Sequence, residues 1–451
     1  MENTPIRVGM ISLGCPKNQV DAEVMLAKLT GEGFTLTPHA DAADVVIVNT
    51  CGFIEDAKKE SIENILEMAQ LKKEGAIRGL VVTGCLSERY FKEMRQEFPE
   101  VNCILQVGRA GDIAEAVRAA ADGGTLDFSG RPESLAAGGT RVLTTLPFYS
   151  YLKIAEGCDN HCTYCIIPKL RGRYRSRPLD DLVREAEQLA ARGVRELTLV
   201  AQDTTRYGTD LSGGKRMLPE LLRRFCRIDG LHWVRLLYCY PEALDDELID
   251  TIASEEKVVP YLDMPIQHVS PRVVRAMNRR MSKAEITALV CKLRARIPDV
   301  TLRTTLIVGF PGETEEEFAE LAAFVRETRF ERLGAFAYSQ EEGTPAAELP
   351  GQIDEDVKKR RQEQIMEEQM LVADANNQRR LGSTVEVLVE GYDRYAGCWF
   401  GRSAAEAPEI DGKIFIRSQK TNRPGTFVSV HLDEVCGDDL IGSLEEGEMQ
   451  A

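Results

Sequence analysis

Three cysteines, Cys158, Cys162 and Cys165, are spaced C-x-x-x-C-x-x-C in the segment KIAEGCDNHCTYCIIP. Three thiolates in one tight loop can bind three irons of a cubane iron–sulfur cluster and leave the fourth iron without a protein ligand. An open iron on a redox-active cluster can chelate the amino and carboxylate groups of S-adenosylmethionine and pass one electron to its sulfonium. The resulting radical removes hydrogen from an unreactive carbon. The spacing of this loop triad (Cys158, Cys162 and Cys165) therefore favours radical chemistry.

The main alternative for the loop is zinc, because His161 would complete a Cys₃His ligand set. A zinc site of this size normally pairs two such knuckles, and no second knuckle follows nearby in the sequence. Tyr164, an aromatic residue directly before the last cysteine, also fits a radical site that binds S-adenosylmethionine better than it fits zinc. Unliganded thiols are the third possibility.

A second set of cysteines, Cys15, Cys51 and Cys85, is spread over 71 residues, yet each has the same local setting. Each follows an apolar run, VGMISLG, VVIVNT or LVVTG, that reads as a strand. The carboxyl ends of parallel strands share one edge of a sheet, so these thiols are expected to converge there. Three matching placements favour a metal or cluster site over small buried residues. We call Cys15, Cys51 and Cys85 the dispersed triad.

The elements around the dispersed triad predict a doubly wound parallel sheet over residues 5–121. Apolar runs at 7–13, 44–50, 79–84 and 102–108 alternate with amphipathic helical stretches. Residues 122–143, rich in Gly, Ser and Pro, are expected to be a surface linker.

A second alternating region, residues 144–376, contains six β/α units and predicts a partial (β/α)6 barrel, since eight units would close a full one. Residues 354–380, which extend from this region into the next, lack Pro and Gly and read as one long helix. From 377 to 446 short β runs with Gly-rich turns suggest a small oligonucleotide-binding-like β-barrel.

Composition places the chain among cytoplasmic proteins. No run of 18 apolar residues is present, and the first residues lack the pattern of a signal peptide. The 12 cysteines in 451 residues are too sparse for a disulfide scaffold. A formal net charge of −16 favours a basic partner over a polyanion.

Taken together, these features resemble those of the radical-SAM methylthiotransferases. The resemblance rests on the segments SLGCPKNQVDAE, NTCGFIEDA and TGC together with the loop triad, and it covers nearly the whole sequence. It implies an N-terminal cluster domain, a radical-SAM core and a C-terminal TRAM barrel. Pro16 after Cys15, LVAQDTTRYG at 199–208 and GRSAAEAPEIDG at 401–412 are similar to the RimO class, which modifies ribosomal protein S-twelve, whereas the MiaB class modifies transfer RNA.

The resemblance implies two 4Fe–4S clusters, one on each triad, and addition of a methylthio group to the β-carbon of an aspartate. One S-adenosylmethionine would supply the methyl group and another the radical, while the cluster on the dispersed triad would handle the sulfur. The implied partners are ribosomal protein S-twelve and an electron donor such as flavodoxin or ferredoxin.

Further cofactor-binding residues are expected at strand ends. By family position Gln202 and Asp203 help to bind S-adenosylmethionine, although both could simply terminate a strand. Gly309 and Gly312, in VGFPGET, allow either close approach to a ligand or only a turn. Arg175, in the run RGRYRSRP, is either solvated or contacts a carboxylate of the cofactor or substrate.

The charge of the C-terminal barrel bears on the substrate. Residues 381–451 contain 13 Asp or Glu and 6 Lys or Arg, a formal charge of −7. Such a barrel would repel phosphates and attract a Lys/Arg-rich ribosomal protein, unless its acidity serves solubility alone. The alternative hypotheses are a transfer-RNA methylthiotransferase and a zinc-stabilised RNA-binding protein without catalysis.

Overall fold

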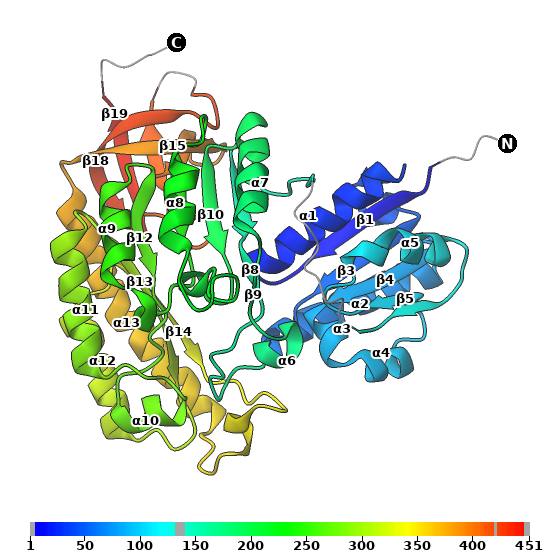
Figure 1. Ribbon diagram of the computed structural model, residues 1–451, viewed down its shortest axis with the longest axis horizontal. Helices are drawn as coiled ribbons and strands as arrows, with labels where there is room; N and C mark the ends of the chain where they lie inside the picture. The colour runs from blue at the N-terminus through cyan, green and yellow to red at the C-terminus, as the bar shows by residue number, and fades with distance from the viewer. Residues whose placement is uncertain (1–4, 131–139, 419–421, 446–451) are drawn as a thin grey trace.

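The structure is a computed structural model that describes residues 5–130, 140–418 and 422–445. The chain forms three parts: a sheet domain that contains the N-terminus, a central half-barrel, and a small barrel at one end of it (Figure 1). No described helix has both the length and the apolar character that a membrane crossing requires.

The N-terminal domain is a parallel sheet with the strand order β2-β1-β3-β4-β5-β6. Helices α1 and α5 cover one face, and α2 and α4 cover the other. Strands β3 and β4 in its centre are buried on both sides, which explains their continuous apolar runs. The elements are β1 (Arg7–Ser12), α1 (Pro16–Gly31), β2 (Thr35–Thr37), β3 (Val45–Thr50), α2 (Glu55–Lys73), β4 (Gly79–Gly84), α3 (Cys85–Arg89), α4 (Phe91–Glu97), β5 (Cys103–Leu105), α5 (Ile113–Ala121) and β6 (Leu126–Phe128).

The doubly wound sheet is confirmed, but it has two more strands than the sequence indicated. Both are three-residue edge strands, β2 and β6, too short to show a periodicity. Strand β6 lies within the segment 122–143 that was expected to be a linker, and it pairs in parallel with β5. Residues 131–139 of that segment lie outside the described residues.

The core is the predicted open half-barrel of six parallel strands, which follow one another in chain order from β7 to β14. Helices pack on its outer face, and a short antiparallel pair, β8 and β9, follows the first strand. The strands are β7 (Tyr149–Lys153), β8 (Ala155–Glu156), β9 (Arg175–Ser176), β10 (Glu196–Val200), β11 (Trp233–Leu236), β12 (Val258–Asp263), β13 (Thr301–Val308) and β14 (Arg332–Ala337). The helices are α6 (Ile167–Arg171), α7 (Leu179–Ala191), α8 (Leu218–Cys226), α9 (Asp246–Ser254), α10 (Pro271–Ala276), α11 (Lys283–Arg296), α12 (Glu315–Thr328) and α13 (Glu355–Arg380).

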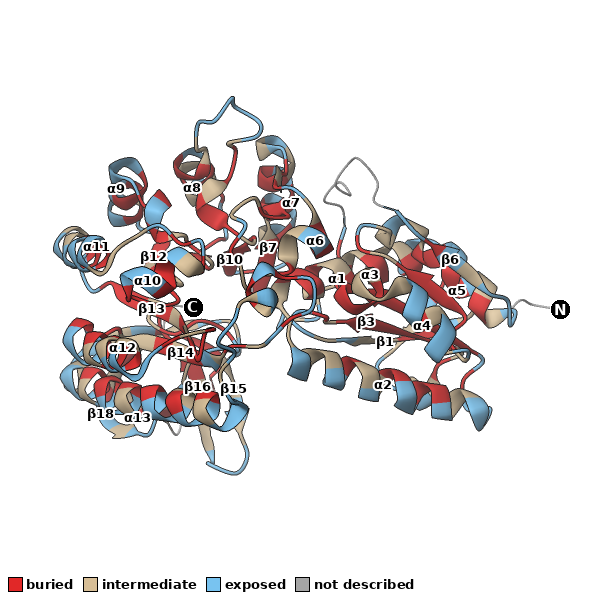
Figure 2. Cartoon of the chain, turned by 90° about the horizontal axis from the view of Figure 1, so that it is seen from below, coloured by how far each residue is buried: buried red, intermediate tan, exposed pale blue. Residues whose placement is uncertain are grey.

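The burial pattern shows how the two large parts meet. Buried residues run through both sheets and continue where α1 and α3 of the N-terminal domain approach β7 and α6 of the core (Figure 2). The carboxyl ends of both sheets, where parallel folds place their sites, therefore face one another across this interface.

The C-terminal part is a closed five-stranded barrel, as predicted, and the long helix α13 leads into it. Its strands are β15 (Thr384–Asp393), β16 (Cys398–Arg402), β17 (Ile414–Arg417), β18 (Phe427–Cys436) and β19 (Asp439–Leu444). The buried carboxylate of Glu196, the first residue of β10, accepts hydrogen bonds from Arg235 Nε at 2.7 Å and from Arg402 Nη2 at 2.8 Å. The barrel therefore seals the amino ends of the core strands, opposite the end where the loop triad lies.

Candidate functional site

The loop triad lies between β8 and α6, at the carboxyl end of the first core strand. Cys158 and Cys162 are buried and Cys165 is half-buried. The core anchors the loop, because Cys158 N donates to Gly172 O after α6 at 3.1 Å and Thr163 N donates to Met277 O after α10 at 3.1 Å. The three thiols thus lie on one short segment that distant parts of the core hold in place.

The loop thiols lie near enough to influence one another. Burial raises the pKa of Cys158 to about 11, and the neighbouring Cys162 thiol adds to this effect. Burial and the Cys162 thiol also raise the pKa of Cys165. Thiolates rather than thiols bind metals, so iron binding has to favour the deprotonation of these cysteines.

The dispersed triad converges as its strand-end positions predicted, on the neighbouring strands β1, β3 and β4. Cys15 precedes α1, Cys51 follows β3, and Cys85 begins α3. The backbone beside Cys51 packs closely on Cys85, because a Cβ at Gly52 would lie 2.9 Å from Cys85 C. Burial raises the pKa of Cys51 to about 12, and the thiols of Cys85 and Cys15 contribute.

Close backbone packing holds these three strand ends. Gly14 has a φ of 91°, and a Cβ there would lie 2.8 Å from Cys51 Cβ. Gly84 has a φ of 102°, and a Cβ there would overlap with the backbone of Thr50. The hydroxyl of Ser61 accepts from Cys51 N at 3.0 Å and donates to Cys51 O at 2.9 Å. Larger residues at these glycines would separate the cysteines.

Cys85 of the dispersed triad packs across the domain interface against α6, the helix that follows the loop triad. Cys85 forms a buried apolar cluster with Leu170 and with Ile166, which directly follows Cys165 in the sequence. Arg171, the last residue of α6, places Nη2 3.5 Å from Cys85 Sγ. The helix that follows one triad thus touches a member of the other.

Buried charges reinforce this interface. Arg171 Nη1 donates to Asp21 of α1 and to Glu156 of β8, each at 3.0 Å. Lys153 forms ion pairs with the same two carboxylates. Arg171 lies in the arginine run of the sequence, and its carboxylate partners come from the chain itself.

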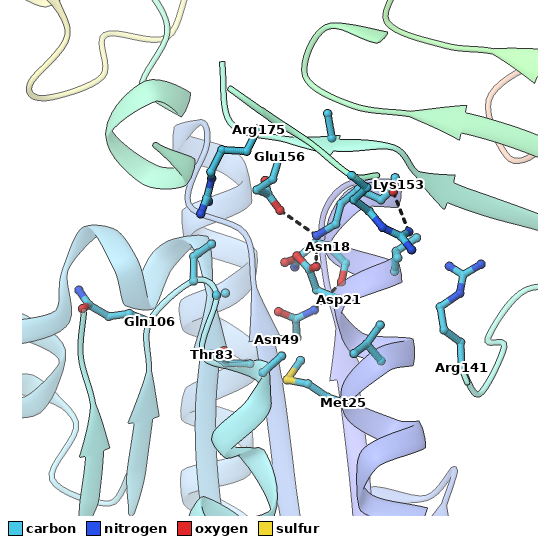
Figure 3. Close-up of a pocket in the computed structure, with 18 of the residues that line it drawn as sticks. Asn18, Asp21, Met25, Asn49, Thr83, Gln106, Arg141, Lys153, Glu156 and Arg175 are labelled. Carbon is cyan, nitrogen blue, oxygen red and sulfur yellow. Dashed lines mark hydrogen bonds and ion pairs between the residues drawn. The ribbon is translucent and has the colours of Figure 1, made fainter. Parts of the chain in front are cut away.

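A cavity of about 90 Å³ with both apolar and charged lining residues lies beside this network, between α1, the carboxyl ends of β3 and β4, and the core. Figure 3 shows Asn18 and Asp21 of α1 and Asn49 of β3 on one side, with Lys153 and Glu156 on the other. Arg175 also lines this cavity.

Gln202 and Asp203 follow β10 beside the loop triad. Gln202 Nε2 lies 3.4 Å from Glu156 Oε1, and its own Oε1 is buried without a hydrogen-bond partner in the described part of the chain. Asp203 accepts from Asn160 Nδ2 at 2.9 Å and from Thr205 Oγ1 at 2.6 Å. Gln202 therefore has an oxygen that can still accept a hydrogen bond from a ligand. Asp203 instead stabilises the loop that carries Cys158, Cys162 and Cys165.

Tyr164 and the two glycines of VGFPGET differ in their surroundings. Tyr164 is half-buried and packs beside Phe310 and Tyr338. A Cβ at Gly309 would overlap with the side chain of Lys358 on α13, and one at Gly312 would lie 3.4 Å from Arg272 Nη1. The glycines pack against protein, which favours the turn role.

Several residues near the triads were not singled out from the sequence. Tyr240 places its hydroxyl 3.5 Å from Cys162 Sγ, and the Arg279 guanidinium lies 4.2 Å from the Tyr240 ring centroid. Gln267 has a buried Oε1 without a partner among the described residues. Lys17 and Tyr238 meet between the triads. Tyr238, Tyr240 and Gln267 all follow core strands, so the strand-end rule that found Gln202 would have found them too.

A groove of about 660 Å³ opens beside Cys162 and is lined by Asn160, Asp203, Tyr240 and Arg279, among others. Within the described ranges, no three or more Cys, His, Asp or Glu side chains surround one point closely enough to hold a single metal ion. Thiolates on a cubane cluster each bind a different iron, so this observation concerns single-ion sites only.

Models of three protein families match the chain. Residues 7–106 match the Uncharacterized protein family UPF0004, residues 152–325 the Radical SAM superfamily, and residues 381–444 the TRAM domain. Two solved structures share the fold: the radical S-adenosylmethionine methyltransferase TsrM from Kitasatospora setae with cobalamin and a 4Fe–4S cluster (TM-score 0.55, 16% identity, 76% of this chain and 77% of that chain), and the same enzyme with tryptophan and a SAM analogue (TM-score 0.54, 16% identity, 73% and 72%).

The fold, the loop triad and these matches define a radical-SAM protein with an additional N-terminal domain and a TRAM barrel. Curated relatives extend over the whole chain. Proteins named ribosomal protein uS12 methylthiotransferase RimO are 49% identical in Lachnoclostridium phytofermentans (98% of this chain, 100% of the relative), 50% in Pelotomaculum thermopropionicum (97% and 99%) and 47% in Geobacter sulfurreducens (98% and 100%). The chain belongs to the RimO family of methylthiotransferases.

Proposed function

We propose that this chain adds a methylthio group to the β-carbon of an aspartate in ribosomal protein uS12. One S-adenosylmethionine is the methyl donor and a second is the radical source. The observation that carries the proposal is the packing of Cys85 against Ile166, next to Cys165, because it joins the two triads. A reaction that needs both a radical source and a sulfur source requires such proximity.

The side chains of the two triads fit two 4Fe–4S clusters. Each is a set of three thiols, gathered on one short loop or at the ends of three neighbouring strands, and three thiolates are the donor set that leaves one iron open. Cys158, Cys162 and Cys165 would hold a cluster that supplies one-electron chemistry to S-adenosylmethionine, and Cys15, Cys51 and Cys85 would hold one that supplies the sulfur to be transferred. Burial of Cys85, Cys158 and Cys162 shields them from water.

Unpartnered polar atoms support a place for S-adenosylmethionine beside the loop triad. Gln202 Oε1 and Gln267 Oε1 are both buried at the carboxyl ends of core strands and accept no hydrogen bond within the described residues. Buried polar atoms normally have partners, so a ligand with N–H or O–H groups fits there. We assign Gln202, Gln267 and Tyr164 to cofactor binding, and Asp203 to support of the loop through Asn160.

The position of the TRAM barrel constrains how the substrate binds. The barrel seals the end of the core opposite the loop triad. A basic substrate attracted by the acidic barrel must therefore reach along the core to place its aspartate between the triads. We further propose a cytoplasmic location, where the ribosomal protein is found, and an external donor of single electrons such as flavodoxin or ferredoxin.

The test is to incubate anaerobically reconstituted, reduced protein and S-adenosylmethionine with uS12 and, separately, with transfer RNA. Mass spectrometry is expected to find the methylthio addition on uS12 alone, at an aspartate. Modification of the RNA alone would contradict the proposal.

Metal analysis of the anaerobically purified protein is the control for the cofactors. About eight irons per chain are expected for two cubane clusters. Zinc without iron would exclude a methylthiotransferase that acts on uS12 and one that acts on transfer RNA, and would leave the hypothesis of a zinc-stabilised RNA-binding protein.

A further inference from the structure

Lys17 is a buried cation at the interface between the triads. It is the second residue of α1, two residues after Cys15, and its side chain is only 7% exposed. Its Nζ crosses to the core and lies 3.3 Å from the ring centroid of Tyr238. A lysine usually keeps its ammonium in water, so this placement calls for an explanation.

Lys17 differs from the other buried cations of the described chain in its partners. Eight further Lys and Arg side chains are buried there, and each has a carboxylate in ion-pair contact: Arg141, Arg171, Arg177, Arg235, Arg279, Lys358, Arg361 and Arg402. No Asp or Glu among the described residues pairs with Lys17. Burial of a charge is unfavourable unless an opposite charge accompanies it, and the Tyr238 ring offsets only part of that cost.

Tyr238 itself is held rigidly. It has a φ of 61°, which is rare outside glycine, and its N–H donates to Asp263 Oδ2 at 3.0 Å. Its carbonyl accepts from Thr204 N at 3.0 Å. Strained backbone conformations of this kind gather at functional sites. The ring therefore presents a fixed platform for the ammonium.

The side chain of Lys17 also reaches from the helix that follows Cys15 to a ring that follows a core strand. On one side Cys15 is its near neighbour in sequence, and on the other Tyr238 stands two residues before Tyr240, whose hydroxyl is 3.5 Å from Cys162 Sγ. A carbon that loses hydrogen near one triad and gains sulfur near the other must pass through this space. In aspartate, the carboxylate is bonded directly to the β-carbon.

We propose that Lys17 binds the side-chain carboxylate of the substrate aspartate and thereby selects aspartate for modification. The inference rests on the proposed function and deepens it. The competing role is charge compensation for the cluster on the dispersed triad, since Cys15 is adjacent. Arg171 already contacts Cys85 of that triad, whereas the ammonium of Lys17 lies near Cys15 and also over the Tyr238 ring of the core, and the test below separates the two roles.

The test compares uS12 with uS12 whose target aspartate is replaced by asparagine, which has the same shape without the charge. Affinities of both for the cluster-loaded protein with S-adenosylmethionine are measured for wild type, Lys17→Met and Lys17→Arg. Wild type is expected to prefer aspartate by about tenfold to a hundredfold, as a charged hydrogen bond provides. Lys17→Met is expected to reduce this preference to about twofold or less, and Lys17→Arg to retain part of it.

Lys28→Met is the matched control, because Lys28 lies on the same helix but is only partly buried, with a side chain 38% exposed, and pairs with Glu32. It makes the same change in charge and should keep the full preference. Iron content and the electron paramagnetic resonance spectrum of each variant show whether both clusters remain.

Two results would overturn the inference. A Lys17→Met protein that binds both substrates more weakly by the same factor would assign Lys17 to the cluster or to packing. If the wild type modifies uS12 but binds the asparagine form as tightly as the aspartate form, the inference is also wrong. This second result needs no Lys17 variant, so it is available even if Lys17→Met fails to fold. Failure of wild type to modify uS12 at all would instead contradict the proposed function.

Discussion

The loop triad takes its geometry from eight consecutive residues, whereas the dispersed triad takes its geometry from three strands of a sheet. Hydrogen bonds from Cys158 to Gly172 and from Thr163 to Met277 anchor this segment to the core. Cys15, Cys51 and Cys85 instead meet only if β1, β3 and β4 pair in the correct register. The ligands of the first site are therefore together in one segment before the core anchors it, whereas the ligands of the second site come together only in the folded sheet.

Because of this difference, each triad can be disrupted without disrupting the other. Changes in the loop remove one group of ligands and leave the N-terminal sheet intact. Changes at Gly14 or Gly84 would instead disturb the dispersed triad without touching any cysteine, because both glycines pack against the strand end that carries Cys51.

The largest expected effect comes from removing one cysteine from either triad. Cys162→Ala should lose about four of eight irons and all cleavage of S-adenosylmethionine, because the loop triad is the radical source. Cys51→Ala should also lose about four irons and all methylthio transfer, yet still cleave S-adenosylmethionine. Iron analysis and chromatography of 5′-deoxyadenosine measure both.

Cys291→Ala, at an exposed cysteine outside both triads, is the control and should keep all irons and both activities. Equal loss of S-adenosylmethionine cleavage in Cys162→Ala and Cys51→Ala would contradict the division of tasks between the triads.

The next largest effect concerns Arg171, which joins the triads. Arg171→Met leaves Asp21 and Glu156 with only Lys153 and should destabilise the interface by about 3–5 kcal/mol, since it leaves buried charge uncompensated. Hydrogen exchange in α1 and α6 measures this local opening. Arg7→Met, at an exposed pair with Asp44, should change stability by about 0–1 kcal/mol. Similar exchange in both variants would show that Arg171 does not hold the interface.

The sequence was sufficient to predict those features of the fold and the site that depend on a pattern shared by many residues. Apolar runs predicted the strands that carry Cys15, Cys51 and Cys85, and the shared edge of parallel strands predicted their meeting. It missed β2 and β6, whose three residues are too few for a pattern. It could not assign Arg171 to Asp21, because these residues lie 150 positions apart and meet only through the docking of two domains.

A smaller effect tests whether a strand-end position is sufficient for ligand binding. Gly309 follows β13 much as Gln202 follows β10, yet Gly309 packs against Lys358. Gly309→Ala should therefore lower the free energy of unfolding by about 1–3 kcal/mol, because its φ of 71° and the overlap both oppose a side chain. The dissociation constant for S-adenosylmethionine should stay the same. A weaker affinity with unchanged stability, measured by calorimetry and urea unfolding, would return Gly309 to the cofactor site.

Gln202 at the equivalent strand end should behave in the opposite way. Its Oε1 is buried without a partner in the described chain, so Gln202→Ala removes an acceptor that only a ligand would use. Loss of one hydrogen bond of about 1 kcal/mol should raise the dissociation constant for S-adenosylmethionine about fivefold. Stability should change little, since the one contact of Gln202 to Glu156 is long at 3.4 Å. Gln70→Ala, on the exposed face of α2, is the matched control and should leave the affinity unchanged. If Gln202→Ala were destabilised but bound S-adenosylmethionine normally, Gln202 would be only a strand terminator, and the unpaired oxygen would need another ligand.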